Sequence, residues 1–175
     1  MKKTVFHLAT ACLIAAGTLS SAAQSRPAPA PKTAHAAANP SKDAAQAFFT
    51  AFGKGDFEGI VNAFHESCTI TAVREAGRTG AQVYGTYRGK VGVKSFLANL
   101  GSAFDTKAFA VANVVGEGPV AFANGTFTHL VKSSGQLYTS DWALMCVVKD
   151  GKILEYHFYE DSEKFAEASK KALGN

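Results

Sequence analysis

The sequence predicts one α+β domain, with helices on its N-terminal side and a run of antiparallel strands after them. Two observations predict this class. Apolar residues recur with a helical period over most of residues 44–64 and 89–104, whereas they mainly alternate from residue 108 onward. The second observation is a pair of long runs rich in aromatic and β-branched residues, 136–149 and 152–161. They are joined at Asp150-Gly151, which is a strong hairpin signal.

Residues 1–23 have the features of a secretory signal peptide. Lys2 and Lys3 form a positive start, residues 5–19 form an apolar core, and residues 21–23 are small. The apolar run is shorter than the roughly 20 residues that a membrane-spanning helix needs. We therefore expect cleavage after Ala23 and a periplasmic or secreted mature protein without a membrane span.

Residues 24–41 are expected to form a solvated Pro/Ala-rich linker, because they hold four of the five prolines and almost no large apolar side chain. The folded domain then comprises residues 42–175, which is long enough for one core and a cavity. From Lys42 onward, 14 Lys and Arg residues balance 14 Asp and Glu residues. This balance, without a basic stripe, argues against nucleic acid as a partner.

The first half of the domain is predicted to contain three helices. Ser41 or Asp43 can cap the first helix, which residues 53–55 end with two glycines. Asp56 can cap a second, short helix whose buried side carries apolar residues from 57 to 64. A strand is expected over 67–75 and a short extended piece over 84–88, and the third helix follows over 89–104.

The second half is predicted to be mainly strands. Residues 108–115 and 120–131 alternate around a turn at 116–119, and they lead into the hairpin. A last helix over 162–172 can be capped by Asp161 or Ser162. The two cysteines of the domain, Cys68 and Cys146, both fall on predicted strands, and we expect them to be buried and unpaired.

If Asp150 and Gly151 are the two turn residues, the hairpin register follows, with Lys149 opposite Lys152. The expected pairs farther from the turn are Met145 with Tyr156, Ala143 with Phe158, and Asp141 with Glu160. Neither face of this hairpin is plainly polar, so we expect both faces to be covered, one by helices and the other by loops or a second chain.

Three motifs in order, residues 55–71, 87–97 and 150–161, resemble the nuclear transport factor 2-like superfamily. By pattern they are most similar to its SnoaL-like and ketosteroid-isomerase-like branches. The resemblance spans essentially residues 42–172. It implies a cone-shaped domain, in which a strongly curved antiparallel sheet wraps around three helices and a short C-terminal helix follows. A pocket is implied in the open end of the cone.

The resemblance does not carry over the known catalytic groups. The tyrosine, the base and the protonated acid of the isomerase branch fall on Phe48, Ala72 and Ala143. The histidine and aspartate of the cyclase branch fall on Tyr156 and Phe158. Because these side chains neither accept nor donate the required protons in that way, steroid isomerisation by that route is rejected.

Asp141 and Glu160 are the candidate acid and base, since the predicted register places them across from each other on an apolar face. Two close carboxylates in a dry site do not both ionise readily, so one is held protonated. The simpler interpretation places Glu160 in water and Asp141 in an ion pair with Arg74 or Arg88. A titration that shows one carboxyl with a raised pKa separates the two hypotheses.

A ligand pocket is expected from the apolar face of the hairpin and the first helix, with Arg74, Tyr84 and Tyr87 near its mouth. No pair of histidines has metal-ligand spacing with a nearby carboxylate, and no cofactor motif occurs, so neither a metal nor a cofactor is predicted. The predicted ligand-binding residues are Phe48, Phe52, Ala72, Arg74, Tyr84, Tyr87, Ala143, Met145, Tyr156 and Phe158.

Two functional hypotheses follow. The first is an exported domain that binds a small, largely apolar molecule in the pocket, without an assigned reaction, and that forms a homodimer through the outer face of the sheet. The second is a small-molecule isomerase, lyase or hydrolase that uses Asp141 and Glu160 as its acid and base. The first explains the missing catalytic groups, and the second explains acids on an apolar face.

Overall fold

The computed structural model describes residues 39–77, 80 and 82–170. The predicted signal peptide, the linker up to residue 38 and the end of the last predicted helix, residues 171 and 172, lie outside the described residues. The first helix begins at Pro40, slightly earlier than predicted, and its cap is Asn39 rather than Ser41 or Asp43. The Asn39 side chain accepts a hydrogen bond from the Lys42 amide, while the Ser41 hydroxyl donates to the Val120 carbonyl at 3.0 Å.

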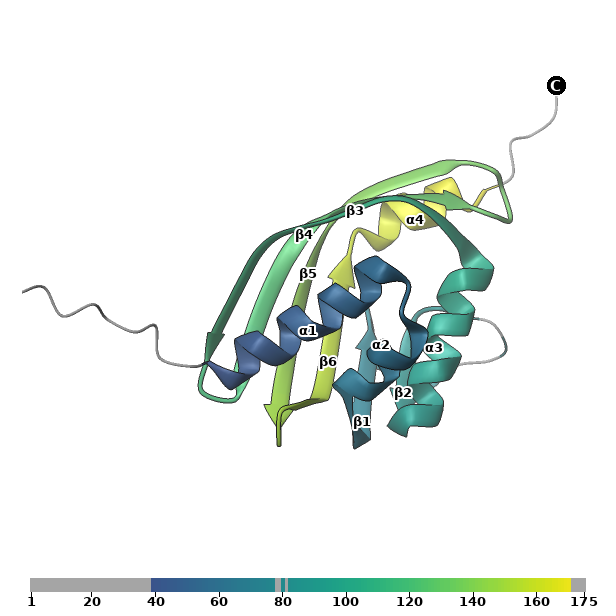
Figure 1. The fold of residues 1–175 in the computed structure, drawn as a ribbon. Coiled ribbons are helices and arrows are strands. Elements are labelled where there is room, and N and C mark those ends of the chain that lie inside the picture. The colour runs from purple at the N-terminus through teal and green to yellow at the C-terminus, as the bar shows by residue number, and fades with distance from the viewer. Residues whose placement is uncertain (1–38, 78–79, 81, 171–175) are drawn as a thin grey trace, which may run out of the picture. The chain divides into compact units, whose positions relative to one another are not determined.

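The described residues form helices and one six-stranded sheet, which confirms the predicted α+β class (Figure 1). The strands lie in the order β2-β1-β6-β5-β4-β3. Helices α1, α2 and α3 lie against one side of the curved sheet, and α4 follows the last strand. The helices are α1 (Pro40–Lys54), α2 (Phe57–Ala63), α3 (Gly89–Ala103) and α4 (Ser162–Ala168). The strands are β1 (Phe64–Ala72), β2 (Gly85–Arg88), β3 (Phe104–Glu117), β4 (Val120–Val131), β5 (Leu137–Lys149) and β6 (Lys152–Glu160).

The helix ends follow the predicted capping chemistry. Gly55 ends α1 in the left-handed conformation, with a φ of 66°, which a residue without a Cβ adopts most easily. The side chain of Asp56 accepts from the Gly59 amide at 2.9 Å, and that of Asp161 accepts from the Lys164 amide at 3.1 Å. These caps fix where α2 and α4 begin and thus orient the chain at both ends of the sheet.

One strand pair departs from the antiparallel pattern, because β1 and β6 run parallel. Every other neighbouring pair in the sheet is antiparallel. The parallel pair brings the end of β1, at Ala72, beside Phe158 of β6. The first motif of the domain thereby meets the last one in the centre of the sheet.

The β5–β6 hairpin contains a β-bulge that the alternation did not reveal. Its turn is as predicted: Asp150 and Gly151 have positive φ angles of 51° and 70°, and Lys149 opposes Lys152. The register then shifts between Val148 and Val147, which oppose Ile153 and Glu155 respectively. Leu154 is left without a register partner, so the side chains of β6 beyond it change faces relative to β5.

The predicted pairing beyond the turn is therefore wrong by one residue. Met145 opposes His157, Ala143 opposes Tyr159, and Glu160 opposes Trp142 rather than Asp141. The inner face of the hairpin, which the helices cover, carries Trp142, Leu144, Cys146, Tyr156, Phe158 and Glu160. The outer face carries Asp141, Ala143, Met145, His157 and Tyr159.

Cys68 and Cys146 are both buried and unpaired, as predicted. Burial raises the pKa of the Cys146 thiol to about 11, so it remains a protonated, apolar side chain at neutral pH. Among the described residues, no helix combines the length and the apolar character needed to cross a bilayer.

Candidate functional site

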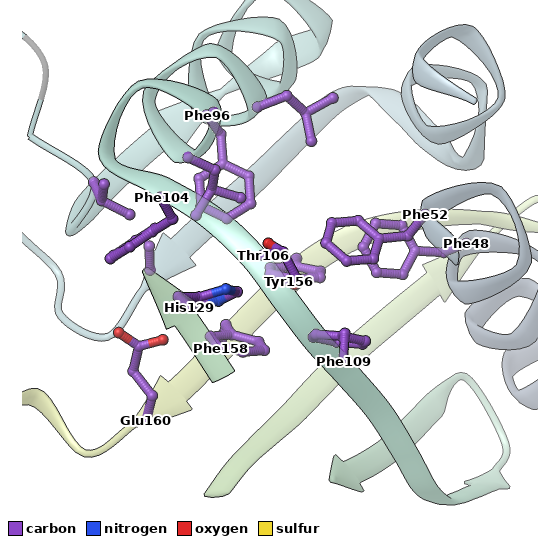
Figure 2. A pocket seen from close by; sticks show the side chains of 15 residues that line it. Phe48, Phe52, Phe96, Phe104, Thr106, Phe109, His129, Tyr156, Phe158 and Glu160 are labelled. Atoms are coloured by element: carbon purple, nitrogen blue, oxygen red, sulfur yellow. The ribbon is translucent and has the colours of Figure 1, made fainter. Parts of the chain in front are cut away.

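An aromatic cavity of about 210 Å³ lies between the inner face of the sheet and the helices α1 and α3 (Figure 2). Its phenylalanines come from four elements, the helices α1 and α3 and the strands β3 and β6. A cavity of this size exceeds the roughly 150 Å³ that holds a single benzene ring. The phenylalanines that line it are Phe48, Phe52, Phe96, Phe104, Phe109 and Phe158.

The helical period of α1 places the rings of Phe48 and Phe52 at one end of the cavity. Phe48 and Phe52 are four residues apart, so both face the sheet from the same side of the helix. Phe48 packs edge-on against Tyr156, with ring centroids 5.5 Å apart, and Phe52 lies 4.9 Å from Phe109. These mutual contacts hold the rings at the cavity wall.

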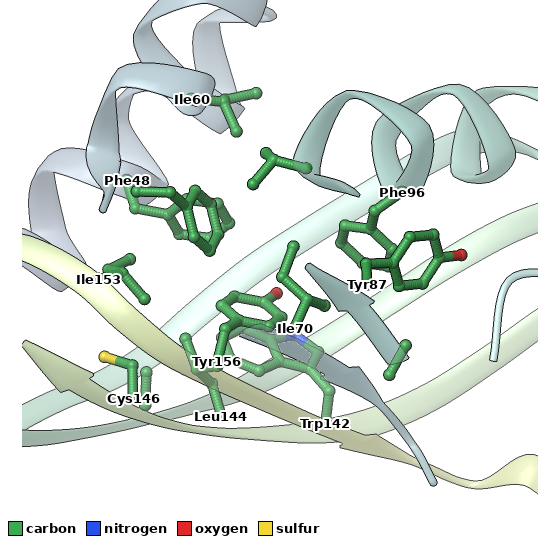
Figure 3. Packing of buried hydrophobic residues seen from close by; sticks show 14 of the residues in the cluster. Phe48, Ile60, Ile70, Tyr87, Phe96, Trp142, Leu144, Cys146, Ile153 and Tyr156 are labelled. Carbon is green, nitrogen blue, oxygen red and sulfur yellow. The ribbon is translucent and has the colours of Figure 1, made fainter. Parts of the chain in front are cut away.

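The wall is supported from behind by the hydrophobic core (Figure 3). The Trp142 ring stacks on Phe109 at 5.1 Å and on Phe158 at 5.6 Å, both of which line the cavity. Trp142 in turn lies over Gly125, where an added Cβ would come within 2.7 Å of its ring and 1.9 Å of the Ala110 carbonyl oxygen. Gly125 thus provides the space that this supporting ring needs.

Glu160 lies at the opposite end of the cavity from Phe48 and Phe52 (Figure 2). The Tyr84 hydroxyl donates a hydrogen bond to its carboxyl oxygen Oε1 at 2.5 Å. Burial raises the pKa of this carboxyl, and hydrogen bonds from Tyr84 and Tyr138 oppose the rise without cancelling it. Glu160 is therefore protonated at higher pH than an exposed glutamate is.

Three aromatic residues around Glu160 close this end of the cavity. Tyr138 donates its hydroxyl to the backbone carbonyl of Asp161 at 2.9 Å. Phe165 of α4 packs against Tyr84 at 5.3 Å and against Tyr138 at 5.5 Å. The short C-terminal helix thus fixes both tyrosines beside the carboxyl.

His129 contributes an uncharged imidazole to the same end. Its ring is stacked between Phe104 and Phe127, with centroid distances of 4.9 and 4.2 Å, and the residue is only 8% exposed. Burial lowers the pKa of His129 to about 4, so the ring is neutral at physiological pH. Its Nδ1 atom is buried and has no hydrogen-bond partner among the described residues.

Thr106 and Tyr156 complete the polar groups of the lining. Burial raises the pKa of the Tyr156 phenol above its usual range, so the phenol remains a neutral donor. No lysine or arginine belongs to the part of the lining that the structure describes. The cavity therefore suits a molecule that is largely apolar, carries no negative charge and has its polar group at the Glu160 end.

The structure places only part of the predicted site at this cavity. Tyr84 does not line the cavity, but it binds Glu160. Tyr87 is buried elsewhere, where its hydroxyl donates to the Val83 carbonyl at 2.7 Å, and Arg74 is exposed beyond β1. The predicted ligand-binding residues that do line the cavity are Phe48, Phe52, Ala72, Tyr156 and Phe158.

The predicted acid and base do not meet. Asp141 is exposed on the outer face of the sheet opposite Thr126, whereas Glu160 lies on the inner face, because the bulge at Leu154 shifts the register by one residue. Ala143 and Met145 face outward for the same reason. Within the described part of the chain, Asp141 forms no ion pair with Arg74 or Arg88 either.

Sequence reasoning left the direction of His129 open and did not assign Thr106 to the site. One signal was available in β4, where the apolar positions Ala121, Ala123 and Phe127 are in phase with His129. That phase predicts an inward imidazole. For metals, the described residues contain no cluster of three histidine, cysteine or acidic side chains that could hold an ion.

Residues 45–156 match the family of SnoaL-like domains. The chain belongs to this family. The match agrees with the curved sheet that encloses a cavity against helices, and it confirms the resemblance found in the sequence. A comparison with curated proteins found no match.

Solved structures share the fold of this SnoaL-like domain. An NTF2-like protein from Burkholderia xenovorans LB400 has a TM-score of 0.65 and 22% identity, covering 76% of this chain and 98% of its own. An NTF2-like protein from Burkholderia thailandensis E264 has a TM-score of 0.66 and 18% identity over the same shares. TerC, co-crystallised with polyporic acid, has a TM-score of 0.64 and 24% identity, covering 74% and 98%. At these identities the likeness concerns the fold.

Proposed function

We propose that this SnoaL-like domain binds a small, uncharged, largely apolar molecule in the aromatic cavity. The observation that carries the proposal is the segregation of the lining: phenylalanine rings surround most of the space, and His129 and Glu160 lie away from the end formed by Phe48 and Phe52. Binding sites for small molecules combine apolar walls with a few convergent polar groups in this way. The structural neighbour TerC has been crystallised with a small molecule, polyporic acid, which agrees with the proposal.

A cavity-filling variant tests the proposal. Leu100 lines the cavity from α3, and Leu100→Trp should occupy the space and weaken binding of naphthalene by at least about tenfold, since the ligand loses its apolar contacts. Val91→Trp is the matched control, because Val91 lies on the same helix and is 79% exposed. Heteronuclear NMR titration measures affinity and location together. Naphthalene binding that leaves the cavity resonances unmoved would contradict the proposal.

Glu160 supports a second candidate function, a small-molecule isomerase, lyase or hydrolase in which this carboxyl transfers a proton. The supporting observation is a carboxyl with a raised pKa that faces the cavity. Asp141 has no part in this hypothesis, because it lies on the outer face. The test is turnover of a molecule retained by the purified protein: Glu160→Gln should abolish turnover, whereas a pure binding protein converts nothing.

We also propose that a second copy of the domain covers the outer face of the sheet. Phe122, Tyr159 and Val115 are 54%, 47% and 59% exposed and lie around one apolar groove with Met145. Apolar side chains gathered in this way favour an association. Analytical ultracentrifugation should show a dimer that Phe122→Lys dissociates. A monomeric wild-type protein at high concentration would reject it.

Export is proposed from the sequence features of residues 1–23. Expression of the full chain followed by cell fractionation should find the mature protein outside the cytoplasm, with Gln24 at its start. An intact N-terminus and a cytoplasmic location would reject the proposal.

A further inference from the structure

We propose that the polar end of the cavity is a subsite for a hydroxyl group on a flat, uncharged aromatic ligand, held by His129, Thr106 and Glu160. The inference rests on the proposed binding function and adds to it the functional group that the ligand carries.

The imidazole of His129 is available only at its edge. Phe104 and Phe127 stack on its two faces at interplanar angles of 23° and 21°, so a polar contact must lie in the plane of the ring. Figure 2 shows the nitrogen-bearing edge turned toward the cavity space. Nδ1 is buried and unpartnered among the described residues, so the ring has hydrogen-bonding capacity that no described protein group uses.

Regular pairing of β3 with β4 places Thr106 beside His129. The two residues oppose each other in the register, so their side chains share the inner face, two positions along from Phe104. The register shifts only beyond this pair, between Thr106 and Ala108. Thr106 thereby joins the lining and offers a hydroxyl that both donates and accepts.

Glu160 adds a fixed acceptor from the other side of the site. Its oxygen Oε1 accepts a hydrogen bond from the Tyr84 hydroxyl, which anchors the carboxyl beside the cavity. Tyr138, the register partner of His129, packs 6.5 Å from the imidazole and lies beside Glu160 through its bond to Asp161. The imidazole and the carboxyl therefore flank one polar space.

The chemistry of these groups selects a hydroxyl. A hydroxyl can donate its one proton to the imidazole nitrogen or to the carboxyl oxygen and accept a hydrogen bond from Thr106 at the same time. A carboxylate ligand is disfavoured, because the described lining holds one acid and no cation. The remaining walls are aromatic rings, which favour a flat apolar body.

Three probes of one shape test the inference: naphthalene, 2-naphthol and 2-naphthoate, titrated against the domain by NMR. We expect 2-naphthol to bind about tenfold more tightly than naphthalene, the effect of one well-formed hydrogen bond. We expect 2-naphthoate to bind more weakly than naphthalene. Naphthalene reports the binding function alone, and the ratio of the two dissociation constants reports the subsite.

Matched variants test whether His129 and Glu160 cause the tighter binding of 2-naphthol. His129→Phe keeps an aromatic ring between Phe104 and Phe127 and should reduce the ratio to nearly one. Its control is His157→Phe on the outer face. Glu160→Gln should reduce the ratio at least twofold, and its control, Glu155→Gln, alters an exposed carboxyl on the same strand.

Each result decides between the claims. A tenfold ratio that both site variants lower and both controls preserve supports the subsite. Equal binding of naphthalene and 2-naphthol would overturn the subsite while leaving the binding function intact. Tightest binding of 2-naphthoate would overturn the charge argument and with it the inference. If none of the probes binds, both the binding function and the subsite fail.

Discussion

The two faces of the β5–β6 hairpin are similarly apolar in sequence, but the inner face is buried and the outer face is largely exposed. The inner face holds Trp142 and Leu144 at 2% exposure each and ends in the buried carboxyl of Glu160. The outer face holds Asp141 and Tyr159, both exposed. Composition does not distinguish the faces. The register does, because a shift of one residue moves every side chain of a strand to the other side.

The difference teaches that one residue, Leu154, decides which carboxyl belongs to the site. Without the bulge, β6 would present His157 and Tyr159 on the same side as Trp142, and Glu160 would join Asp141. With it, Tyr156, Phe158 and Glu160 line the cavity. A bulge is therefore part of the design of this site, as bulges near functional sites often are.

Insertion of one alanine between Glu155 and Tyr156 should have the largest effect. The insertion moves Tyr156 from opposite Cys146 to opposite Met145 and so turns Tyr156 and Phe158 outward. We therefore expect a loss of more than about 5 kcal/mol, enough to unfold a domain of ordinary stability. Circular dichroism during urea titration measures it. Leu154→Ala, which trims the side chain but keeps the bulge, is the control and should cost about 1–2 kcal/mol. A folded insertion variant with an intact cavity would refute the role of the β5–β6 register.

The next largest difference in stability should come from truncating Leu144 and Met145, which are adjacent on β5 but face opposite sides of the sheet. Leu144→Ala removes a buried side chain from the core and should cost about 2–5 kcal/mol of unfolding free energy, whereas Met145→Ala on the half-buried outer face should cost about 1 kcal/mol. Urea denaturation at low protein concentration compares the two variants. Equal losses would mean that the outer face is as densely packed as the inner one.

The sequence was sufficient for most of the fold and for the apolar part of the site. Turn and cap residues such as Gly55, Asp56 and Asp150-Gly151 act through local chemistry, and the structure has them where that chemistry predicts. Phe48 and Phe52 follow from the helical period. The bulge and the parallel β1–β6 pair depend on contacts between distant segments, which no local pattern encodes. The partner of Glu160 was missed for that reason.

His129, at the polar end of the cavity, should make the free energy of unfolding depend on pH. The pKa of His129 in the fold is about 4, below the ordinary value of 6.5, so the fold favours the neutral ring. Its contribution is complete above pH 6.5 and is lost as the pH falls through 4, by on the order of 3 kcal/mol.

His129→Phe removes this titration, and its stability should vary less between pH 6.5 and 4 than that of the wild type. Urea denaturation at several pH values measures the slope. The outer-face variant His157→Phe retains His129 and should therefore retain the slope. An unchanged slope in His129→Phe would show that other groups account for the acid sensitivity.

The smallest effect should come from the hydrogen bond between Tyr84 and Glu160. Tyr84→Phe removes the donor from a buried carboxyl and should cost about 1–2 kcal/mol. Since this bond lowers the pKa of Glu160, its loss should raise that pKa further, which carbon-detected NMR of the carboxyl measures directly. Tyr159→Phe removes a hydroxyl from the exposed outer face and should change neither quantity. A Glu160 pKa that stays fixed in Tyr84→Phe would mean that Tyr138 and burial alone set the protonation of the inner carboxyl.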